Sequence, residues 1–181
     1  MGINVNRGRK NLYSIKETHQ MKKLAYENRS QCVRVIDIDH YKCPQCGKIM
    51  RVLRANFDAS GNTYMLICDD CDLVGKARRE INGNITLKSV PADKKTRALR
   101  AETHYYFDIL HKDGIFVSRE QAYLWLSEQI FSFDTGIKHI GEMNAQQCIM
   151  AIEACKKCLE KNEHRLSHPI VPYENREKSF M

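Results

Sequence analysis

The sequence has no run of about 18 apolar residues, the shortest stretch that crosses a bilayer as a helix. It also lacks the apolar segment of a secretion signal, because Arg7, Arg9 and Lys10 introduce charge too early. Position 6 is Asn6, where a myristoylation signal has serine or threonine. These absences lead us to expect a cytoplasmic protein with no membrane partner.

Signatures of small enzymes are missing as well. Paired CxxC motifs also occur in HNH nucleases, but no histidine lies between Cys46 and Cys68. The zinc-deaminase pattern HxE with PCxxC, the metalloprotease pattern HExxH and the phosphate loop GxxxxGK are all absent. We therefore expect no enzymatic activity and no small-molecule substrate.

What the sequence does contain is a moderate excess of positive charge and eight cysteines. Its 181 residues, 43% of them apolar, fit one medium domain or two small ones. The net charge of +7 is compatible with a nucleic-acid partner, although it does not by itself indicate one. Eight cysteines without an export signal favour metal-bound thiolates over disulfides.

Four of these cysteines form two CxxC pairs, Cys43-Pro-Gln-Cys46 and Cys68-Asp-Asp-Cys71, separated by enough chain for one β-hairpin. Both sulfurs of each pair can reach one tetrahedral ion, and zinc takes four such ligands. Gly47 follows the first pair, where a tight turn directs backbone N–H groups at the sulfurs. We predict one structural zinc ion, Zn2+, with these four ligands. Free core cysteines, redox pairs and a rubredoxin-type iron centre are the alternatives.

A second metal site stays open. Cys155 and Cys158 form another CxxC pair, and His164 and His168 follow it. In a continuous helix the two sulfurs would be near enough for one metal. The apolar stripe that contains Cys155 instead favours a buried core cysteine.

Two hairpins are expected around the four zinc ligands. Residues 32–38 alternate like a strand, residues 48–57 and 63–68 pair across a turn at 58–62, and residues 73–90 form the second hairpin. Asn82-Gly83-Asn84 supplies the second turn, because Asn-Gly adopts the positive φ that short hairpin turns need.

After Pro91 the apolar period changes from two to about 3.6, which predicts three helices. The first spans about residues 93–111, with Gly114 just after its end. The second and third begin at the capping pairs Ser118/Gln121 and Asn144/Gln147. The residues expected on their buried faces are Leu99, Thr103, Tyr106, Phe107 and Leu110, then Ala122, Tyr123, Trp125, Leu126 and Ile130, then Cys148, Ile152, Cys155 and Leu159.

The whole is expected to be an α+β protein, in which a four-cysteine zinc ribbon of β-hairpins precedes a small three-helix domain. We predict a basic N-terminal arm at residues 1–31, the zinc-ribbon domain at 32–90, the three-helix domain at 91–162 and a C-terminal tail at 163–181. Within the arm, residues 13–27 have weak apolar support for a short helix.

Basic residues follow the first CxxC pair, recur on the second hairpin and begin the first helix, where Arg100 follows the others. If the strands pair side by side, these residues make one positive patch that could hold phosphates. The predicted nucleic-acid-binding residues are Lys48, Arg51, Arg54, Arg78, Arg79, Lys94, Lys95 and Arg97. Phosphate should be repelled by the acidic residues in and after the second CxxC pair, Asp69, Asp70 and Asp72. Tyr64 and Phe57 are candidates for base stacking or for the hairpin core.

Several motifs follow one another along the chain in a distinctive order. After the two CxxC pairs come His104 with Phe107-Asp108, then Ser118-Arg-Glu-Gln-Ala-Tyr-Leu-Trp-Leu126, then His139-Ile-Gly141 before the helix with Cys148. In this order, residues 41–159 resemble a family of zinc-ribbon proteins of unknown function found mostly in phages, prophages and bacterial mobile elements. The resemblance implies the four zinc ligands and a bacterial host cell, and it supplies no activity. A catalytic or metal role is the alternative for five of these motif residues, which are expected instead to pack and hydrogen-bond between the three helices: His104, Phe107, Asp108, His139 and Cys148.

Two functions fit these features. The first is a nucleic-acid-binding accessory protein of phage or mobile-element origin, with structural zinc and mainly phosphate-backbone contacts. The second is a protein-binding adaptor or inhibitor that engages a host or phage protein machine. The expected partner is therefore nucleic acid or a host or phage protein.

Overall fold

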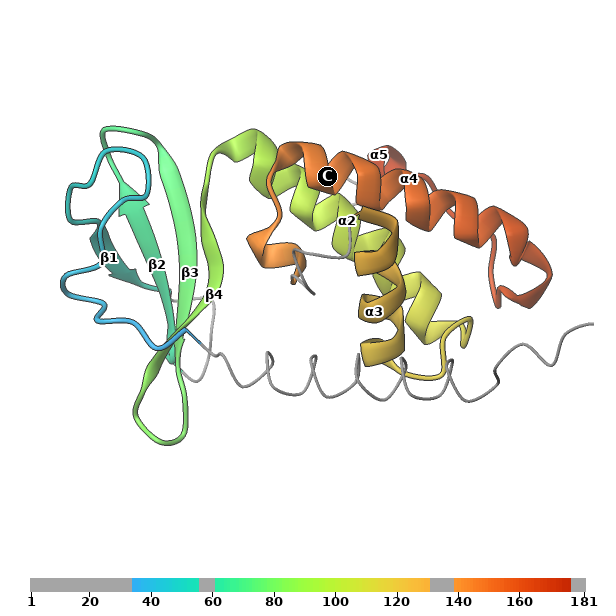
Figure 1. Cartoon of the computed structure of the whole chain (residues 1–181), viewed down its shortest axis with the longest axis horizontal. Coiled ribbons are helices and arrows are strands. Elements are labelled where there is room, and N and C mark those ends of the chain that lie inside the picture. Colours follow the sequence, from blue (N-terminus) through green and yellow to red (C-terminus); the bar gives the residue numbers. More distant parts are fainter. Residues whose placement is uncertain (1–33, 56–60, 131–138, 177–181) are drawn as a thin grey trace, which may run out of the picture. The chain divides into compact units, whose positions relative to one another are not determined.

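The computed structural model describes residues 34–55, 61–130 and 139–176 (Figure 1). They belong to one compact unit, Val33–Met181. The predicted arm with its helix at 13–27, the strand residues 32 and 33, Phe57 and most of the predicted turn at 58–62 lie outside the described residues. The predicted segment boundaries stay predictions.

A four-stranded antiparallel sheet forms the ribbon (Figure 1). Its strands are β1 (Arg51–Arg54), β2 (Thr63–Cys68), β3 (Leu73–Arg79) and β4 (Ile85–Ala92), and their order in the sheet is their order in the chain. Both predicted hairpins are therefore confirmed. In the β3–β4 turn Gly83 has a φ of +83°, and its N–H donates to the Glu80 carbonyl at 2.9 Å. The Asn-Gly signal thus marks the turn correctly.

The sheet has two different ends and two different faces. We call the end with Cys68 and Leu73 the knuckle end, and the end with residues 80–84 the turn end. Side chains alternate between the faces. On the inner face Leu66, Cys68, Leu73 and Ala77 are buried beneath Ile38, Cys43 and Met50. On the outer face, which carries Leu53, Lys76 and Arg78, Leu53 remains 43% exposed. The apolar interior of the ribbon is therefore small and one-sided.

The predicted strand at 32–38 is wrong in its described part. Val35 makes a single bridge to Thr86, and the Ile36 N–H donates to the Ile85 carbonyl at 2.8 Å. Further along β4 the edge is occupied, because a Cβ on Gly141 would lie 2.7 Å from the Lys88 carbonyl oxygen. Only a short stretch of the β4 edge is thus available for pairing, and residues 37–40 turn away from it instead.

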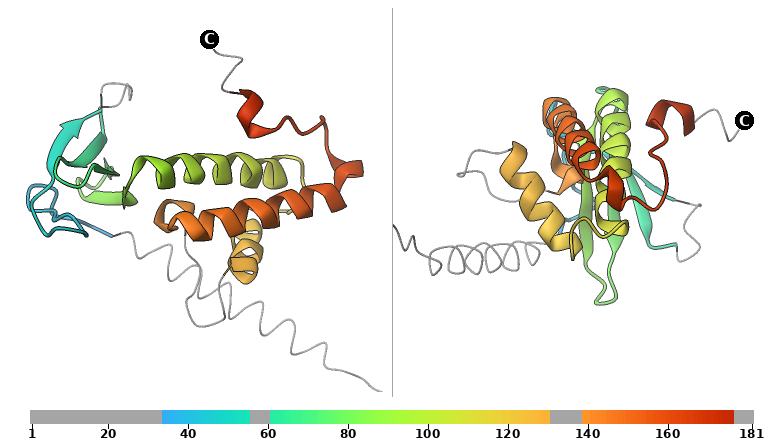
Figure 2. Two further views of the ribbon diagram at one scale, coloured as in Figure 1. Left: turned by 90° about the horizontal axis from the view of Figure 1, so that it is seen from above. Right: turned by 90° about the vertical axis from the view of Figure 1, so that its right-hand side faces the viewer.

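Three long helices follow the sheet: α2 (Lys94–Lys112), α3 (Arg119–Ile130) and α4 (Ala145–Lys161). A 3-10 turn, η1 (Ile140–Glu142), precedes α4. Figure 2 shows α2 and α4 side by side in both views, and they pack along their lengths with α3 against them. Within the described ranges no helix has the length and apolar character to span a membrane. Sheet and helices together confirm the predicted α+β class.

The helix starts agree with the capping signals. Asn144 and Gln147 form a complete capping box, with both bonds at 2.9 Å. At α3 the Gln121 N–H donates to Ser118 Oγ at 3.2 Å, but the Gln121 side chain accepts from Val117 instead of from Ser118. Asp93 caps α2 and is the one residue between β4 and that helix. The chain therefore passes from strand to helix without a loop.

The predicted buried faces are largely confirmed. Cys148, Ile152, Cys155 and Leu159 are all buried on α4, as are Thr103, Tyr106, Phe107 and Leu110 on α2. Leu99, Trp125 and Ile130 are only partly buried. Trp125 instead packs against Phe116, with ring centres 5.2 Å apart.

The segment predicted as a tail is partly structured. It contains η2 (Glu163–Arg165) and α5 (Tyr173–Arg176). The Tyr105 hydroxyl donates to the Val171 carbonyl at 2.7 Å, and the Tyr173 N–H donates to the Tyr106 hydroxyl at 3.2 Å. Residues 167–173 therefore return along α2.

Arg100 on α2 joins the helices to the sheet, and it is buried at 7% exposure. Its Nε donates to the Met143 carbonyl at 2.8 Å, while Nη1 donates to the Val90 carbonyl at 2.7 Å and to Ser89 Oγ at 3.0 Å. A buried guanidinium is stable only when its donors are satisfied. Here two backbone carbonyls and a hydroxyl from two other segments accept from Nε and Nη1.

Replacing Arg100 with Met should destabilise the protein by about 2–4 kcal/mol, because three buried or part-buried acceptors lose their donor. Urea unfolding measured by circular dichroism tests this. Lys95→Met, on the exposed side of the same helix, is the matched control and should change stability by less than about 0.5 kcal/mol. Equal stabilities of the two variants would contradict the role assigned to Arg100.

Candidate metal centre and nucleic-acid interface

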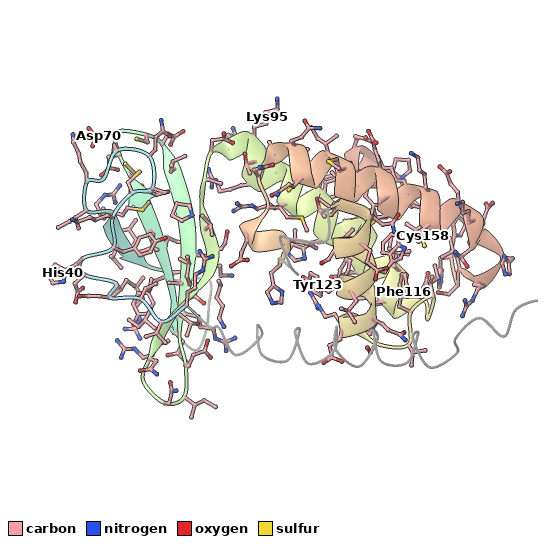
Figure 3. The ribbon with its side chains drawn as sticks, in the orientation of Figure 1. His40, Asp70, Lys95, Phe116, Tyr123 and Cys158 are labelled. Atoms are coloured by element: carbon pink, nitrogen blue, oxygen red, sulfur yellow. The ribbon has the colours of Figure 1, made fainter. Side chains whose placement is uncertain are left out.

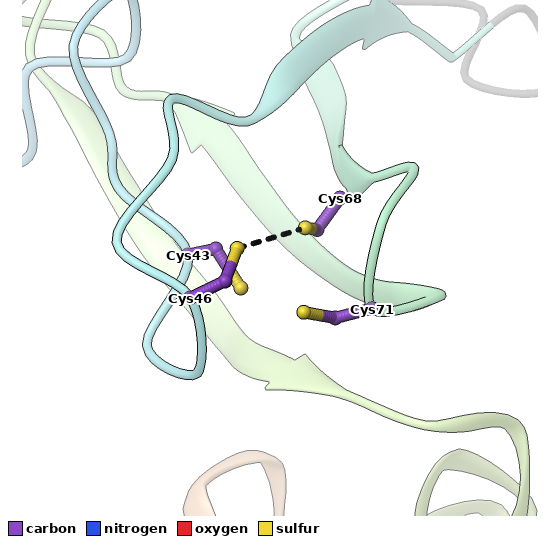
Figure 4. A group of neighbouring side chains, drawn as sticks. All are labelled: Cys43, Cys46, Cys68 and Cys71. Atoms are coloured by element: carbon purple, nitrogen blue, oxygen red, sulfur yellow. Dashed lines mark hydrogen bonds between the residues drawn. The ribbon is translucent and has the colours of Figure 1, made fainter.

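Two tight turns present the four cysteine sulfurs to one another (Figure 4). In the first, the Gly47 N–H donates to the Cys43 carbonyl at 2.9 Å, and the Cys43 N–H donates to the Lys48 carbonyl at 2.8 Å. Gly47 has a φ of +74°, and Asp72, which holds the same place after the second CxxC pair, has a φ of +52°. Both turns thus use a left-handed residue directly after the second cysteine.

The sulfur positions fit a tetrahedral ion. All four ligand atoms lie within 4.8 Å of one another, and Cys46 Sγ lies 3.6 Å from Cys68 Sγ. Zinc–sulfur bonds of roughly 2.3 Å place neighbouring sulfurs roughly 3.8 Å apart in a tetrahedron. The Gln45 N–H also points at Cys43 Sγ, at 3.4 Å, which disperses negative charge on that sulfur.

The thiols influence one another's ionisation. Burial raises the pKa of Cys43, but backbone N–H groups of Cys46 and Gln45 outweigh it and lower that pKa to about 7. The Cys46 sulfur, and then burial, raise the pKa of Cys71 to about 12. Burial also raises the pKa of Cys68. Sulfurs this close resist ionising together unless a cation compensates their charge, and a divalent ion supplies that charge.

Cys43, Cys46, Cys68 and Cys71 therefore form the site of one structural zinc ion. Four protein ligands close the coordination sphere and leave no position for water or substrate. Cys43 and Cys68 also belong to the small core of the inner face. Metal binding and formation of that core are thus parts of one folding event.

The second candidate metal site is not assembled. Across residues 34–55, 61–130 and 139–176, the four zinc ligands are the one group of three or more His, Cys, Asp or Glu side chains within reach of an ion. Cys155 is buried, and burial raises its pKa to about 12. Burial raises the pKa of Cys158 as well. Cys155 therefore fits a core role and Cys158 is half-buried, while His164 and His168 lie on exposed positions.

The acidic residues of the second turn pair with two of the predicted phosphate-binding residues. Lys48 Nζ lies 2.9 Å from Asp70 Oδ1. Arg51 binds Asp69 through two bonds, at 3.0 and 2.7 Å, and the guanidinium lowers the pKa of that carboxyl. Because these carboxylates already balance them, Lys48 and Arg51 are poor candidates for phosphate contacts.

The single patch imagined from the sequence also does not form, because β2 lies between β1 and β3. Register places Arg51 and Arg78 on the outer face but Arg54 and Arg79 on the inner face. Arg54 and Arg79 flank Tyr64, and Arg79 Nε donates to the Tyr64 hydroxyl at 3.2 Å. Tyr64 therefore supports an arginine at the turn end, an interaction that the sequence did not indicate.

Three arginines, Arg54, Arg78 and Arg79, thus gather at the turn end. The side chain of Arg54 donates to the Gly61 carbonyl at 2.8 Å, and none of the three is ion-paired with a carboxylate among the described residues. The nearby Glu80 is already bound by Lys88 Nζ and Thr86 Oγ1, both at 2.6 Å. The turn end therefore keeps its positive charge.

Lys94, Lys95 and Arg97 begin α2 at the knuckle end, and Figure 3 labels Lys95 and Asp70 there, away from the β3–β4 turn. Lys94 and Lys95 are exposed, and Arg97 Nε is buried without a hydrogen-bond partner. These three residues are therefore spatially separate from the arginines of the turn end.

The motif residues His104, Asp108 and His139 meet around Tyr123 and Arg119. Arg119 Nη2 lies 3.7 Å from Asp108 Oδ1, and the Arg119 guanidinium lies 5.8 Å from the centre of the Tyr123 ring. The Tyr123 and His139 rings meet edge-on with centres 5.0 Å apart. Burial lowers the pKa of His104. The arrangement fits the expected packing role between α2, α3 and the start of η1.

A family model described as a zinc-finger-containing domain matches residues 39–158. The match covers the four zinc ligands, the sheet and most of α4. No curated protein and no solved structure matches the chain.

Purified protein should contain one zinc ion per chain, and Cys68→Ser should lose it together with the ribbon fold, because three sulfurs no longer close the site. Elemental analysis and the melting temperature measure both effects. Cys158→Ser, which removes a thiol outside the site, should retain the zinc. A Cys68→Ser protein with full zinc and an unchanged melting temperature would refute the assignment.

Asp72→Gly should stabilise the zinc-bound protein by up to about 1 kcal/mol, because glycine adopts a positive φ without steric cost. Gly47→Ala should destabilise it by about 1 kcal/mol for the same reason. Beyond the two neighbouring residues no atom lies within 4 Å of a Cβ at position 47, so the cost there is conformational. Thermal unfolding in excess zinc measures both changes, and the same sign for both would be inconsistent with this account.

Proposed function

We propose that this chain, which belongs to the family of zinc-finger-containing domains, is a nucleic-acid-binding accessory protein of phage or mobile-element origin. In this proposal the zinc ion is structural, and the protein contacts mainly the phosphate backbone. The host compartment is the bacterial cytoplasm.

The observation that carries the proposal is the turn-end arginine group, Arg54, Arg78 and Arg79. Arginine recognises phosphate through several N–H donors in a fixed plane. Arg79 is already oriented by Tyr64, whose ring lies 6.0 Å from its guanidinium carbon, so ordering this side chain on a ligand costs less entropy. Contacts on both faces of one hairpin suit a ligand that surrounds its tip.

Charge distribution along the sheet supports the same choice. At the knuckle end Asp69 and Asp70 offset Arg51 and Lys48. At the turn end the arginines are not offset in this way. A polyanion would therefore approach the turn end with less repulsion and without breaking an ion pair. Lys94 and Lys95 are a separate, weaker candidate for phosphate binding.

A protein-binding adaptor is the second candidate, and the outer face of the sheet favours it. Val35 is 60% exposed and Leu53 43% exposed on that face. Exposed apolar groups beside charged ones are common in protein interfaces. Under both proposals the protein has no enzymatic activity, which is consistent with a zinc site that offers no open coordination position.

Arg54→Glu with Arg78→Glu should weaken binding to a DNA duplex and reduce the salt dependence of log K by about 0.9 for each phosphate that the protein no longer neutralises. Fluorescence anisotropy at several salt concentrations measures this. Lys48→Glu with Arg51→Glu is the charge-matched control and should bind more nearly like the parent protein, because those cations are already paired. The reverse ranking of the two double variants would defeat the proposal.

Pull-down from lysate with and without nuclease distinguishes the two candidate functions. Under the nucleic-acid proposal, captured partners are released after nuclease treatment. A protein partner that survives nuclease and is insensitive to the arginine substitutions would support the adaptor instead.

A further inference from the structure

The tip of the β3–β4 hairpin combines an exposed apolar side chain with a rigid backbone. Ile81 is fully exposed, and residues 81–84 are all exposed. An exposed isoleucine alone is ordinary on a protein surface. Here it lies in the turn of the hairpin that carries Arg78 and Arg79, which makes its position informative.

The tip is held by several hydrogen bonds. The Glu80 N–H donates to the Asn84 carbonyl at 2.8 Å, and the Gly83 N–H donates back to the Glu80 carbonyl at 2.9 Å. The Asn84 N–H also donates to Asn82 Oδ1 at 3.1 Å. Glu80 is fixed from outside the turn by Lys88 and Thr86. The backbone that presents Ile81 therefore has little conformational freedom left to lose on binding.

The charges around the tip identify its partner. Arg78 projects from the outer face and Arg79 from the inner face, directly before residue 80. The Arg79 guanidinium also lies 3.5 Å from the Gly83 carbonyl, so it follows the turn closely. An apolar tip with an arginine on each side is complementary to a groove that has stacked bases at its floor and a phosphate backbone on each rim.

We infer that Ile81 acts as an apolar wedge that enters the minor groove of a nucleic-acid duplex and partly unstacks one base step, while Arg78 and Arg79 bind the two phosphate backbones. Apolar wedges of this kind are inserted from the minor groove and kink the duplex. The inference rests on the proposed nucleic-acid function and adds the form of the ligand and the mode of contact. It requires no base-specific recognition, and it favours flexible pyrimidine–purine steps.

The probe is a DNA duplex of about 12 base pairs with one TA step, whose adenine is replaced by 2-aminopurine. The parent protein should bind it and raise the 2-aminopurine fluorescence, which reports unstacking. Ile81→Ser should bind roughly tenfold more weakly and abolish the fluorescence rise, because the variant has no apolar side chain to bury between the bases. Val117→Ser, at a site 90% exposed on the helical part of the chain, is the matched control and should behave like the parent.

The outcomes separate this inference from the proposal on which it rests. If the parent protein binds neither DNA nor RNA, whether duplex or single-stranded, then the wedge and the proposed nucleic-acid function are both overturned. If the parent protein binds the duplex and Ile81→Ser has the same affinity and gives the same fluorescence rise, the wedge is overturned and nucleic-acid binding stands. If Ile81→Ser weakens binding to a single-stranded oligonucleotide as much as it weakens binding to the duplex, the minor-groove assignment is also overturned, because a single strand has no groove.

Discussion

The bonds between one zinc ion and four cysteine sulfurs hold the ribbon together. The apolar core of the sheet lies on one face, and Cys43 and Cys68 are themselves part of it. Without the metal, four thiols face one another at the end of the sheet, and ionisation of one of them opposes ionisation of the others. The positions of β1 and β3, and therefore of the arginines at their far ends, depend on this closed tetrahedron.

The same metal site organises charge along the sheet. The second cysteine turn brings Asp69 and Asp70 next to Arg51 and Lys48, which offsets the charge of those two cations. At the other end, Glu80 is bound by Lys88 and Thr86 and also lies within the field of Arg78, so one carboxylate faces three arginines and a lysine. The two ends of one small sheet thus differ in charge because of a few ion pairs, and the function we propose follows from that difference.

Local signals in the sequence predicted much of the fold. The CxxC spacing, Asn82-Gly83 and the Asn144/Gln147 cap each depend on residues close in the chain, and each was confirmed. The positions of the charged residues on the sheet, which were predicted incorrectly, depend on strand register. Whether Arg51 faces Asp69, or Arg54 shares a face with Arg79, is decided by which residues pair across strands, and a one-residue slip reverses every face. Arg100 was expected in the positive patch and is buried instead, because a buried arginine has the same sequence pattern as an exposed one.

Asp93 alone separates the last strand from the first helix, and it also caps that helix with a bond of 2.6 Å to the Thr96 N–H. The direction in which β4 ends therefore sets the rotation of α2 about its axis. One inserted or deleted residue at this junction would turn the apolar stripe of α2 by about 100°, away from α4. Among homologous chains, the length of this segment should therefore tolerate less variation than its composition.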